Sequence, residues 1–326
     1  MEIRSLDGDD PATLAALLPG FRETMRLELP ADPPVTEALL ARLFQRRHGT
    51  ERIVLAAYDS SAPETPAGVL KLGLDLGDPA GPGHGSLWVF PGFRRRGAGR
   101  ALAAAGGSAL RERGRDLMLA DAPSGTAAEG FARGLGAERI GETVRNRLRL
   151  AGPAHEVLKA AAARPPSGYR LAHWTGPCPD GLVESYARAW SALEERVNGR
   201  PRTRRPSPAD VRAREAEAER AGHRTHTVAA LPEHGADRGE IVGYSTLFTR
   251  DSPMADAGET VVLPRHRRHG LGTGLKADLL VRAAQDRPGL LLVQVFNDVG
   301  NTAVVALNRR LGFEADSYWS TYALKV

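Results

Sequence analysis

The feature that most constrains the fold of this chain is one glycine-rich segment that occurs twice. VFPGFRRRGAGRAL at 89–102 and VLPRHRRHGLGTGL at 262–275 carry the same residue types at positions 173 apart. The matching pairs are Val89/Val262, Pro91/Pro264, Arg94/Arg267, Gly97/Gly270, Gly99/Gly272 and Leu102/Leu275. A chain of 326 residues exceeds the size at which a single hydrophobic core usually stops growing. The repeat therefore predicts two similar domains.

The order of hydrophobic patterns supports this division, because both halves give the same series of elements. Alternating or continuous apolar runs predict strands, and runs of helical period predict helices. Each half gives a strand, two helices, three strands, a helix, a strand, a helix and a strand, which is an α/β (α+β) order. We predict domains at 1–152 and 169–326, joined by a linker at 153–168 that ends in Pro-Pro-Ser-Gly.

Composition restricts the class of protein. The formal charge is +5, but aromatic residues make up 6% and do not alternate with the arginines, so we do not predict nucleic-acid binding. An arginine- and proline-rich stretch at 198–208 is typical of a solvated loop. The single cysteine, Cys178, excludes an intramolecular disulfide. No apolar run reaches the length of a membrane span, and we expect a soluble, cytoplasmic protein.

The repeated segment has the pattern of an anion-binding turn. A strand that ends in proline and enters a helix through Arg-x-x-Gly-x-Gly leaves backbone N–H groups at the positive end of the helix dipole. The pattern is neither a P-loop nor a dinucleotide-binding fingerprint. The predicted ligand-binding positions in the second copy are Val262, Leu263, Arg267, Arg268, His269, Gly270, Leu271, Gly272 and Thr273. In the first copy they are Val89, Arg94, Arg95, Arg96, Gly97, Ala98, Gly99 and Arg100.

These residues resemble the pyrophosphate-binding motif of the Gcn5-related N-acetyltransferases (GNAT), Val-x-Pro-x-x-Arg-x-x-Gly-x-Gly/Ala after the fourth strand. The predicted element order also agrees with that family in each half, so the resemblance covers nearly the whole chain. It implies tandem GNAT folds, each with a twisted, mostly antiparallel mixed sheet flanked by helices. It also implies that acetyl-CoA is the ligand of the glycine turn.

A second signature of the family follows the fifth strand. There an asparagine faces the coenzyme and Leu-Gly-Phe ends the helix, and the second half supplies Asn301 and Leu311-Gly312-Phe313. Asn297, Asn301 and Asn308 would share one helix face if the helix began early, although Asn297 could instead be a helix N-cap. The first half has Gly125 in place of the asparagine. By analogy with tandem relatives such as mycothiol synthase, we place catalysis in the second domain and regard the first as partly degenerate.

The resemblance also assigns catalytic roles. Glu259, three residues before Val262, lies where relatives often have a general base, and the alternative is a plain carboxylate at the start of a strand. The backbone N–H of Leu263 would polarise the thioester carbonyl. Many relatives protonate the leaving thiolate with a tyrosine at the position that Asn308 occupies here. Tyr322 could serve as the general acid in its place, and the alternative is that Tyr322 only packs in the core or on the surface. His266 and His269 lack a carboxylate or cysteine cluster, and we predict no metal site.

The expected function is transfer of an acetyl group from acetyl-CoA to the amine of a small molecule, by direct attack and without a covalent enzyme intermediate. The acceptor is left open among aminoglycosides, thiol-sugar intermediates, amino acids, polyamines and protein N-termini. The competing hypotheses are a non-catalytic acyl-CoA-binding or sensor protein and a protein N-terminal or lysine acetyltransferase. We expect no membrane partner and a monomer or homodimer.

Overall fold

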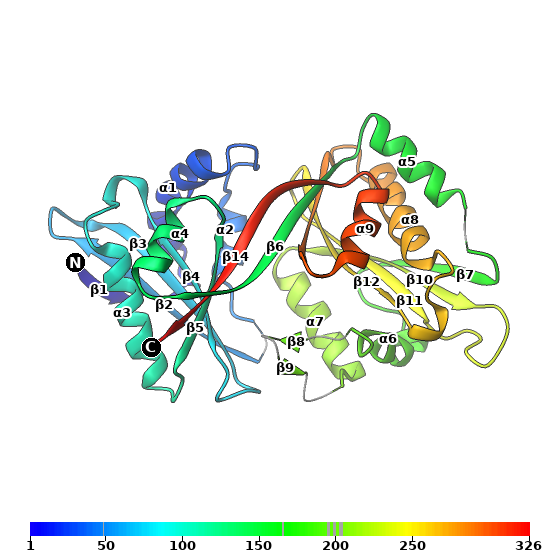
Figure 1. The fold of residues 1–326 in the computed structure, drawn as a ribbon, viewed down its shortest axis with the longest axis horizontal. Helices are drawn as coiled ribbons and strands as arrows, with labels where there is room; N and C mark the ends of the chain where they lie inside the picture. The colour runs from blue at the N-terminus through cyan, green and yellow to red at the C-terminus, as the bar shows by residue number, and fades with distance from the viewer. Residues whose placement is uncertain (48, 165, 194–195, 198–199, 202–204) are drawn as a thin grey trace. The chain divides into compact units, whose positions relative to one another are not determined.

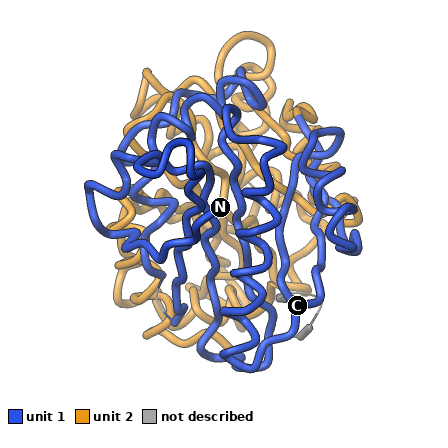
Figure 2. Tube along the Cα trace, turned by 90° about the vertical axis from the view of Figure 1, so that its left-hand side faces the viewer, with its two compact units in different colours: residues 1–143, 317–326 blue, residues 144–316 orange. Residues whose placement is uncertain are grey.

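The computed structural model describes residues 1–326 except 48, 165, 194–195, 198–199 and 202–204, so residues 198–199 and 202–204 of the predicted loop at 198–208 lie outside the described residues. The chain forms two compact units, of which unit 1 contains residues 1–143 and 317–326 and unit 2 contains residues 144–316 (Figure 2). Each unit is an α/β structure built on its own part of the β-structure (Figure 1). The predicted fold class is confirmed.

Unit 1 has strand order β1-β2-β3-β4-β5-β14, antiparallel except for the β4–β5 pair. Its strands are β1 (Glu2–Ser5), β2 (Thr50–Asp59), β3 (Ala62–Asp75), β4 (Gly83–Val89), β5 (Leu117–Pro123), the start of β6 (Glu138–Arg149) and the end of β14 (Glu314–Lys325). Its helices are α1 (Pro11–Glu28), α2 (Glu37–Phe44), α3 (Ala98–Arg111) and α4 (Ala127–Gly134). Separate apolar cores lie under α1 and α2 and under α3.

Unit 2 repeats this plan with order β7-β10-β11-β12-β13-β6, and β12 and β13 are the parallel pair. Its strands are β7 (Tyr169–Thr175), β10 (Arg224–Pro232), β11 (Gly243–Thr249), β12 (Met254–Val262) and β13 (Leu292–Asp298), with the short β8 (Arg196–Val197) and β9 (Arg200–Pro201) apart from them. Its helices are α5 (Pro153–Ala162), α6 (Val183–Trp190), α7 (Pro208–Arg220), α8 (Leu271–Asp286) and α9 (Thr302–Arg310). One apolar core packs against α5 and α8, and another against α6 and α7.

The structure differs from the predicted domains in its last strands. We predict that β6 completes the first half and β14 the second, but β14 pairs with β5, with Trp319 opposite Pro123 and Lys325 opposite Leu117. The strand order places β6 beside β13 in unit 2. The two halves therefore exchange their final strands. Hydrophobic periodicity identifies each strand but carries no information on which sheet edge it joins.

The predicted linker also differs. Residues 153–162 form α5, and Leu158 of this helix is completely buried in the core that α8 covers. Burial of that apolar face makes the helix part of unit 2. The alanine-rich sequence predicts the helix, whereas its packing partner lies more than a hundred residues away.

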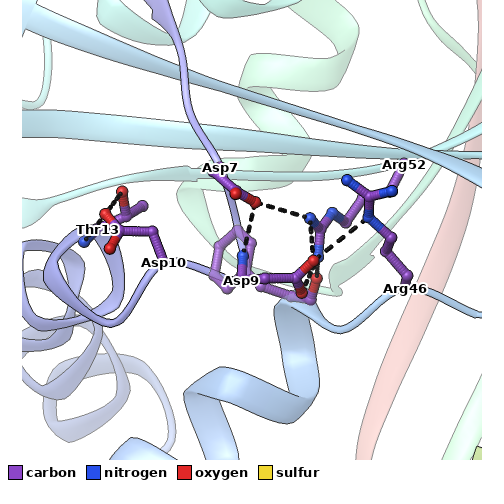
Figure 3. Close-up of polar contacts among 7 residues, drawn as sticks. Asp7, Asp9, Asp10, Thr13, Arg46 and Arg52 are labelled. Carbon is purple, nitrogen blue, oxygen red and sulfur yellow. Dashed lines mark hydrogen bonds and ion pairs between the residues drawn. The ribbon is translucent and has the colours of Figure 1, made fainter.

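Local signals in the sequence explain where several helices begin. The Asp10 carboxylate accepts hydrogen bonds from the N–H groups of Ala12 (3.2 Å) and Thr13 (3.0 Å) and thereby caps α1. Ser207 and Asp210 form a reciprocal capping box at α7. Figure 3 shows Asp10 together with the ion pairs that precede α1, in which Arg52 contacts Asp7 (3.3 Å) and Asp9 (2.7 Å). The hydrogen bond from Arg52 lowers the pKa of Asp9, and these contacts fix the loop after β1 against β2.

Candidate functional site

The two glycine turns have the same backbone conformation. Arg95 and Arg268 occupy the left-handed region with φ of 63° and 69°, and they are the non-glycine residues with positive φ in the described chain. This conformation costs a non-glycine residue about 1–3 kcal/mol, and such strain concentrates at functional sites. Gly97 and Gly270 follow with φ of 89° and 77° and serve as the N-caps of α3 and α8. Both turns therefore retain the same strained shape.

Each turn leads into a helix whose first N–H groups lack a side-chain cap. Within the described residues, no side chain accepts a capping hydrogen bond at the Gly97 or Gly270 N-cap. The turn residues Arg268, His269 and Gly270 are exposed. Leu271 is 1% exposed and its side chain packs in the apolar core, so that side chain is not available to a ligand. Gly272 is partly buried, and a Cβ there would lie 3.1 Å from Leu307 Cδ1. Exposed N–H donors at a positive helix end form a site for an anion.

An arginine of each turn forms a hydrogen bond to the last part of the strand that precedes the turn. Arg94 Nε donates to the Val89 carbonyl (3.1 Å), and Arg267 Nε donates to the Val262 carbonyl (3.0 Å). In unit 1 the Arg94 guanidinium also pairs with Glu28 (2.5 Å), and Arg96 lies 3.9 Å from Asp59. Arg267 has no acidic partner among the described residues. The turn with more arginines thus has more of its charge neutralised by the protein itself.

Unit 2 has a β-bulge that places Glu259. Ser245 pairs with Thr260 and Leu247 with Ala257, so Thr246 alone faces Gly258 and Glu259. A Cβ at Gly258 would lie 2.2 Å from Thr246 Oγ1, which explains the glycine. Bulges re-aim side chains and often lie next to active sites. In unit 1, β4 pairs with β3 without a shift from Val89 to Gly83, and Ser86 stands 173 residues before Glu259.

The Glu259 carboxylate lies in a polar and aromatic environment. Its side chain is 19% exposed and receives hydrogen bonds from Arg214 (2.5 Å to Oε1) and Thr246 (3.1 Å to Oε2). Arg214 stacks on Trp190, with its guanidinium carbon 4.9 Å from the ring centroid. Burial alone would lower the pKa of Arg214, but Glu259 and Tyr186 outweigh it and raise that pKa. Neither Arg214 nor Thr246 has a sequence motif that could identify it.

Leu263 is not the oxyanion donor that we predict. Its N–H donates to the Val242 carbonyl (2.8 Å), and Phe90 N–H makes the matching bond to Ala67 (3.0 Å) in unit 1. N–H groups alternate in direction along a strand, so the Val262 N–H points to the opposite edge of β12. On that edge the pairing with β13 covers Met254–Asp256, well before Val262. Among the described residues, the backbone donor that faces the open edge of β12 therefore belongs to Val262.

The three asparagines of unit 2, Asn297, Asn301 and Asn308, do not lie on one helix face as predicted. Asn297 is in β13, so it does not share a helix face with the others, and Asn301 is the N-cap of α9, accepting from Val304 N–H at 3.3 Å. Asn301 remains exposed. Asn308 is fully buried; its Oδ1 accepts from Lys276 Nζ (2.6 Å) and its Nδ2 donates to Asn297 Oδ1 (2.7 Å). Burial excludes the predicted direct contact between the Asn308 side chain and the coenzyme.

Tyr322 also differs from its predicted role. It is 5% exposed in the part of β14 that belongs to unit 1, where it pairs with Ala120. Glu259 belongs to unit 2. The chain leaves unit 2 after Asp316, so the substitute general acid is not brought into the unit that holds the predicted base. The packing alternative accounts for this residue.

His266 contacts protein groups on both ring nitrogens. Tyr169 lies 2.9 Å from Nδ1, and Asp237 lies 3.1 Å from Nε2. These contacts tie the turn to the start of β7. Within the described part of the chain, no group of three or more potential metal-ligating side chains gathers. No helix among those residues is both apolar and long enough to cross a bilayer.

Comparison with known proteins identifies the family of this chain. Residues 187–313 match the model of the acetyltransferase (GNAT) family. A mycothiol acetyltransferase of Actinosynnema mirum is 31% identical over 295 residues, which is 89% of each chain. The chain belongs to the GNAT family. A mycothiol acetyltransferase of Salinispora arenicola is 32% identical over 76% of this chain and 74% of its own length. Among solved structures, a tandem GNAT protein from the clavulanic acid biosynthesis pathway has a TM-score of 0.84 and 25% identity over 99% of this GNAT chain and 98% of its own.

The family assignment makes the chain an N-acetyltransferase with two GNAT units. It confirms the predicted resemblance and the predicted enzyme class, and acyl transfer is the shared chemistry of the relatives. The first glycine turn follows β4, the fourth strand of unit 1, and the second follows β12, the fourth strand of the run β7, β10, β11 and β12 in unit 2, as the resemblance requires.

Lys276 of this GNAT chain gives a prediction about stability. It is 2% exposed, its Nζ lies 4.8 Å from the centroid of the Phe313 ring, and burial lowers its pKa to about 7. The unfolded value is about 10.4, so between these values only the unfolded chain holds the proton. Stability should then rise with pH, by up to about 1.4 kcal/mol per unit from this group.

The measurement is urea unfolding of the full chain between about pH 7.5 and about pH 9.5. Lys276→Met should reduce the slope of unfolding free energy against pH, and Lys276→Gln, which keeps a donor for Asn308, should do the same. Lys159→Met, at a half-exposed lysine of α5, is the control and should leave the slope unchanged. An unchanged slope in both Lys276 variants would contradict the assignment.

Proposed function

We propose that unit 2 transfers an acetyl group from acetyl-CoA to the amine of a small molecule by direct attack. The observation that carries this proposal is the bulge that directs Glu259 from the same strand that leads into the anion-binding turn. The carboxylate and the turn are thereby fixed by one strand, β12. Unit 1 has the turn but neither the bulge nor the carboxylate.

The residues of the turn fit the pyrophosphate of the coenzyme. The backbone N–H groups from Arg268 to Thr273 would hold it, with Arg267 bracing the loop through Val262. The absence of a side-chain cap on α8, within the described residues, leaves those donors available. Asn301, exposed at the start of α9, remains a proposed contact. When bound, acetyl-CoA supplies the activated acetyl thioester.

The chain's own groups would serve the transfer in two ways. The Val262 N–H would donate to the thioester carbonyl, where negative charge develops as the amine nitrogen bonds to the acetyl carbon. The Glu259 carboxylate would accept the proton that the amine must lose, since an alkylamine is mostly protonated at neutral pH. The C–S bond then breaks, and the coenzyme leaves as a thiolate. A thiol pKa near 8.5 makes it a tolerable leaving group without a dedicated acid.

The test is release of free coenzyme thiol from acetyl-CoA in the presence of amines of different classes. We expect at least one small-molecule amine to release the thiol. Acetyl-CoA without an amine should release it much more slowly. Acetylation of lysine-containing peptides but of no small amine would favour a protein acetyltransferase. Tight coenzyme binding without turnover of any acceptor would favour a sensor protein and overturn this proposal.

A further inference from the structure

An unpaired donor lies beside the proposed base. Arg214, on α7, directs its NH2 group to Glu259 Oε1, while its NH1 atom is buried and has no hydrogen-bond partner among the described residues. The Trp190 and Phe248 rings lie 4.9 and 5.9 Å from the guanidinium carbon. The Arg214 side chain as a whole is 32% exposed, but the rings and the bond to Glu259 hold the guanidinium with its NH1 atom buried. Buried cationic donors in proteins are normally paired.

The surroundings leave space for a small acceptor group. Arg214 lines a cavity of about 30 Å³ together with Tyr186, Trp190, Thr246 and Phe248. That volume is about two to three times the smallest space that holds one water molecule, so it admits the end of a ligand and no more. Four aromatic side chains are part of the lining, namely Trp174, Tyr186, Trp190 and Phe248, and they favour a flat group such as a carboxylate.

The other charge at this cavity is already neutralised. Glu215 also lines it, but Oε1 accepts from Cys178 N–H (2.7 Å) and Oε2 accepts from Arg212 NH1 (2.7 Å). The charged donor that remains for a ligand in this cavity is therefore Arg214 NH1. Glu259 does not line the cavity but adjoins it through Arg214 and through Thr246, whose hydroxyl donates to Oε2 and leaves that oxygen a second lone pair. The pair of Arg214 NH1 and Glu259 Oε2 is complementary to a molecule that carries both a carboxylate and an ammonium group.

We propose that the acceptor is an amino acid whose carboxylate binds Arg214 NH1 and whose amine is acetylated beside Glu259. The inference rests on the proposed function. NH1 and NH2 share one carbon, and NH2 lies 2.5 Å from Glu259, so the two ligand groups must be close together. One or two carbons between amine and carboxylate satisfy this spacing, as in α- and β-amino acids. A polyamine would instead place a second cation against Arg214.

The experiment compares matched acceptors. Each of a set of amino acids is assayed beside its primary amide and its decarboxylated amine, with acetyl-CoA and the full chain. Loss of a charge-assisted hydrogen bond in a buried site should lower kcat/KM by about 10- to 100-fold for the amide and the amine. Arg214→Gln should reduce this preference to less than about threefold, because only the carboxylate uses NH1.

Two controls separate this subsite from general damage. Arg220→Gln, at an exposed arginine of the same helix, should keep the preference for carboxylates. Quenching of tryptophan fluorescence measures amino-acid binding without turnover, since Trp190 lies at the cavity. Equal turnover of amino acids, amides and amines would overturn the inference and leave the proposed function standing. Carboxylate-dependent binding without turnover would support the subsite but overturn acetylation of amino acids. Neither binding nor turnover of these compounds would overturn the inference, and the proposed function would still stand if an amine of another class were acetylated.

Discussion

Replacement of Glu259 by glutamine should lower kcat by about 10²- to 10⁴-fold, the usual contribution of a positioned general base. Glutamine keeps the size of the side chain and an oxygen that accepts from Arg214, so the aromatic and ionic surroundings should persist. What it removes is the group that takes the amine proton. The measurement is steady-state acetylation of the best amine acceptor between about pH 6 and about pH 10.

The pH profile distinguishes a base from a structural carboxylate. Residual activity of Glu259→Gln should rise steadily with pH, because a growing share of the amine is unprotonated in solution. Glu240→Gln, which removes a surface partner of Arg188, is the control and should behave like the unaltered enzyme. A Glu259→Gln variant with full kcat at neutral pH would show that this carboxylate is not the base.

Replacement of Gly270 by aspartate should raise the dissociation constant of acetyl-CoA by about 100-fold or more. An aspartate at an N-cap accepts hydrogen bonds from the first N–H groups of its helix, which are the donors proposed for the pyrophosphate. It also adds a negative charge. Two lost charge-assisted hydrogen bonds together correspond to a change of about this size. Calorimetric titration of the full chain with acetyl-CoA measures it.

Gly97→Asp in unit 1 is a closely matched control. Both glycines are N-caps with positive φ, and a Cβ at either position would have no heavy atom within 4 Å. The two substitutions therefore carry similar backbone strain. We expect Gly97→Asp to spare turnover, because unit 1 lacks the bulge and the carboxylate, and because Arg94 is paired with Glu28. Loss of turnover in Gly97→Asp alone would place catalysis in unit 1.

The sequence is sufficient to predict the repeated architecture and the anion-binding turns. Glycine and proline positions encode turn geometry directly, and the repeat of Gly97 at Gly270 confirms the pattern within one chain. The sequence does not predict the left-handed conformation of Arg95 and Arg268, since arginine rarely adopts that conformation. That strain becomes visible only in the folded turn.

The errors concern residues whose role depends on distant partners. Leu263 is the predicted oxyanion donor, but the direction of its N–H depends on the register with β11, which turns it to the Val242 carbonyl. Asn308 matches a family position, yet Lys276 from another helix buries it in a polar network. Arg214 belongs to no motif and is 45 residues from the Glu259 that it contacts. Tertiary pairing of this kind is not contained in local spacing.

The central claim is that unit 2 acetylates an amine with the coenzyme held at the Gly270 turn. The most direct measurement is mass-spectrometric detection of the N-acetylated acceptor after incubation with isotope-labelled acetyl-CoA. The unaltered enzyme, Gly270→Asp and Gly97→Asp should be compared at equal concentration. We expect labelled product from the unaltered enzyme and Gly97→Asp and almost none from Gly270→Asp. Product from Gly270→Asp, together with its absence from Gly97→Asp, would contradict the claim.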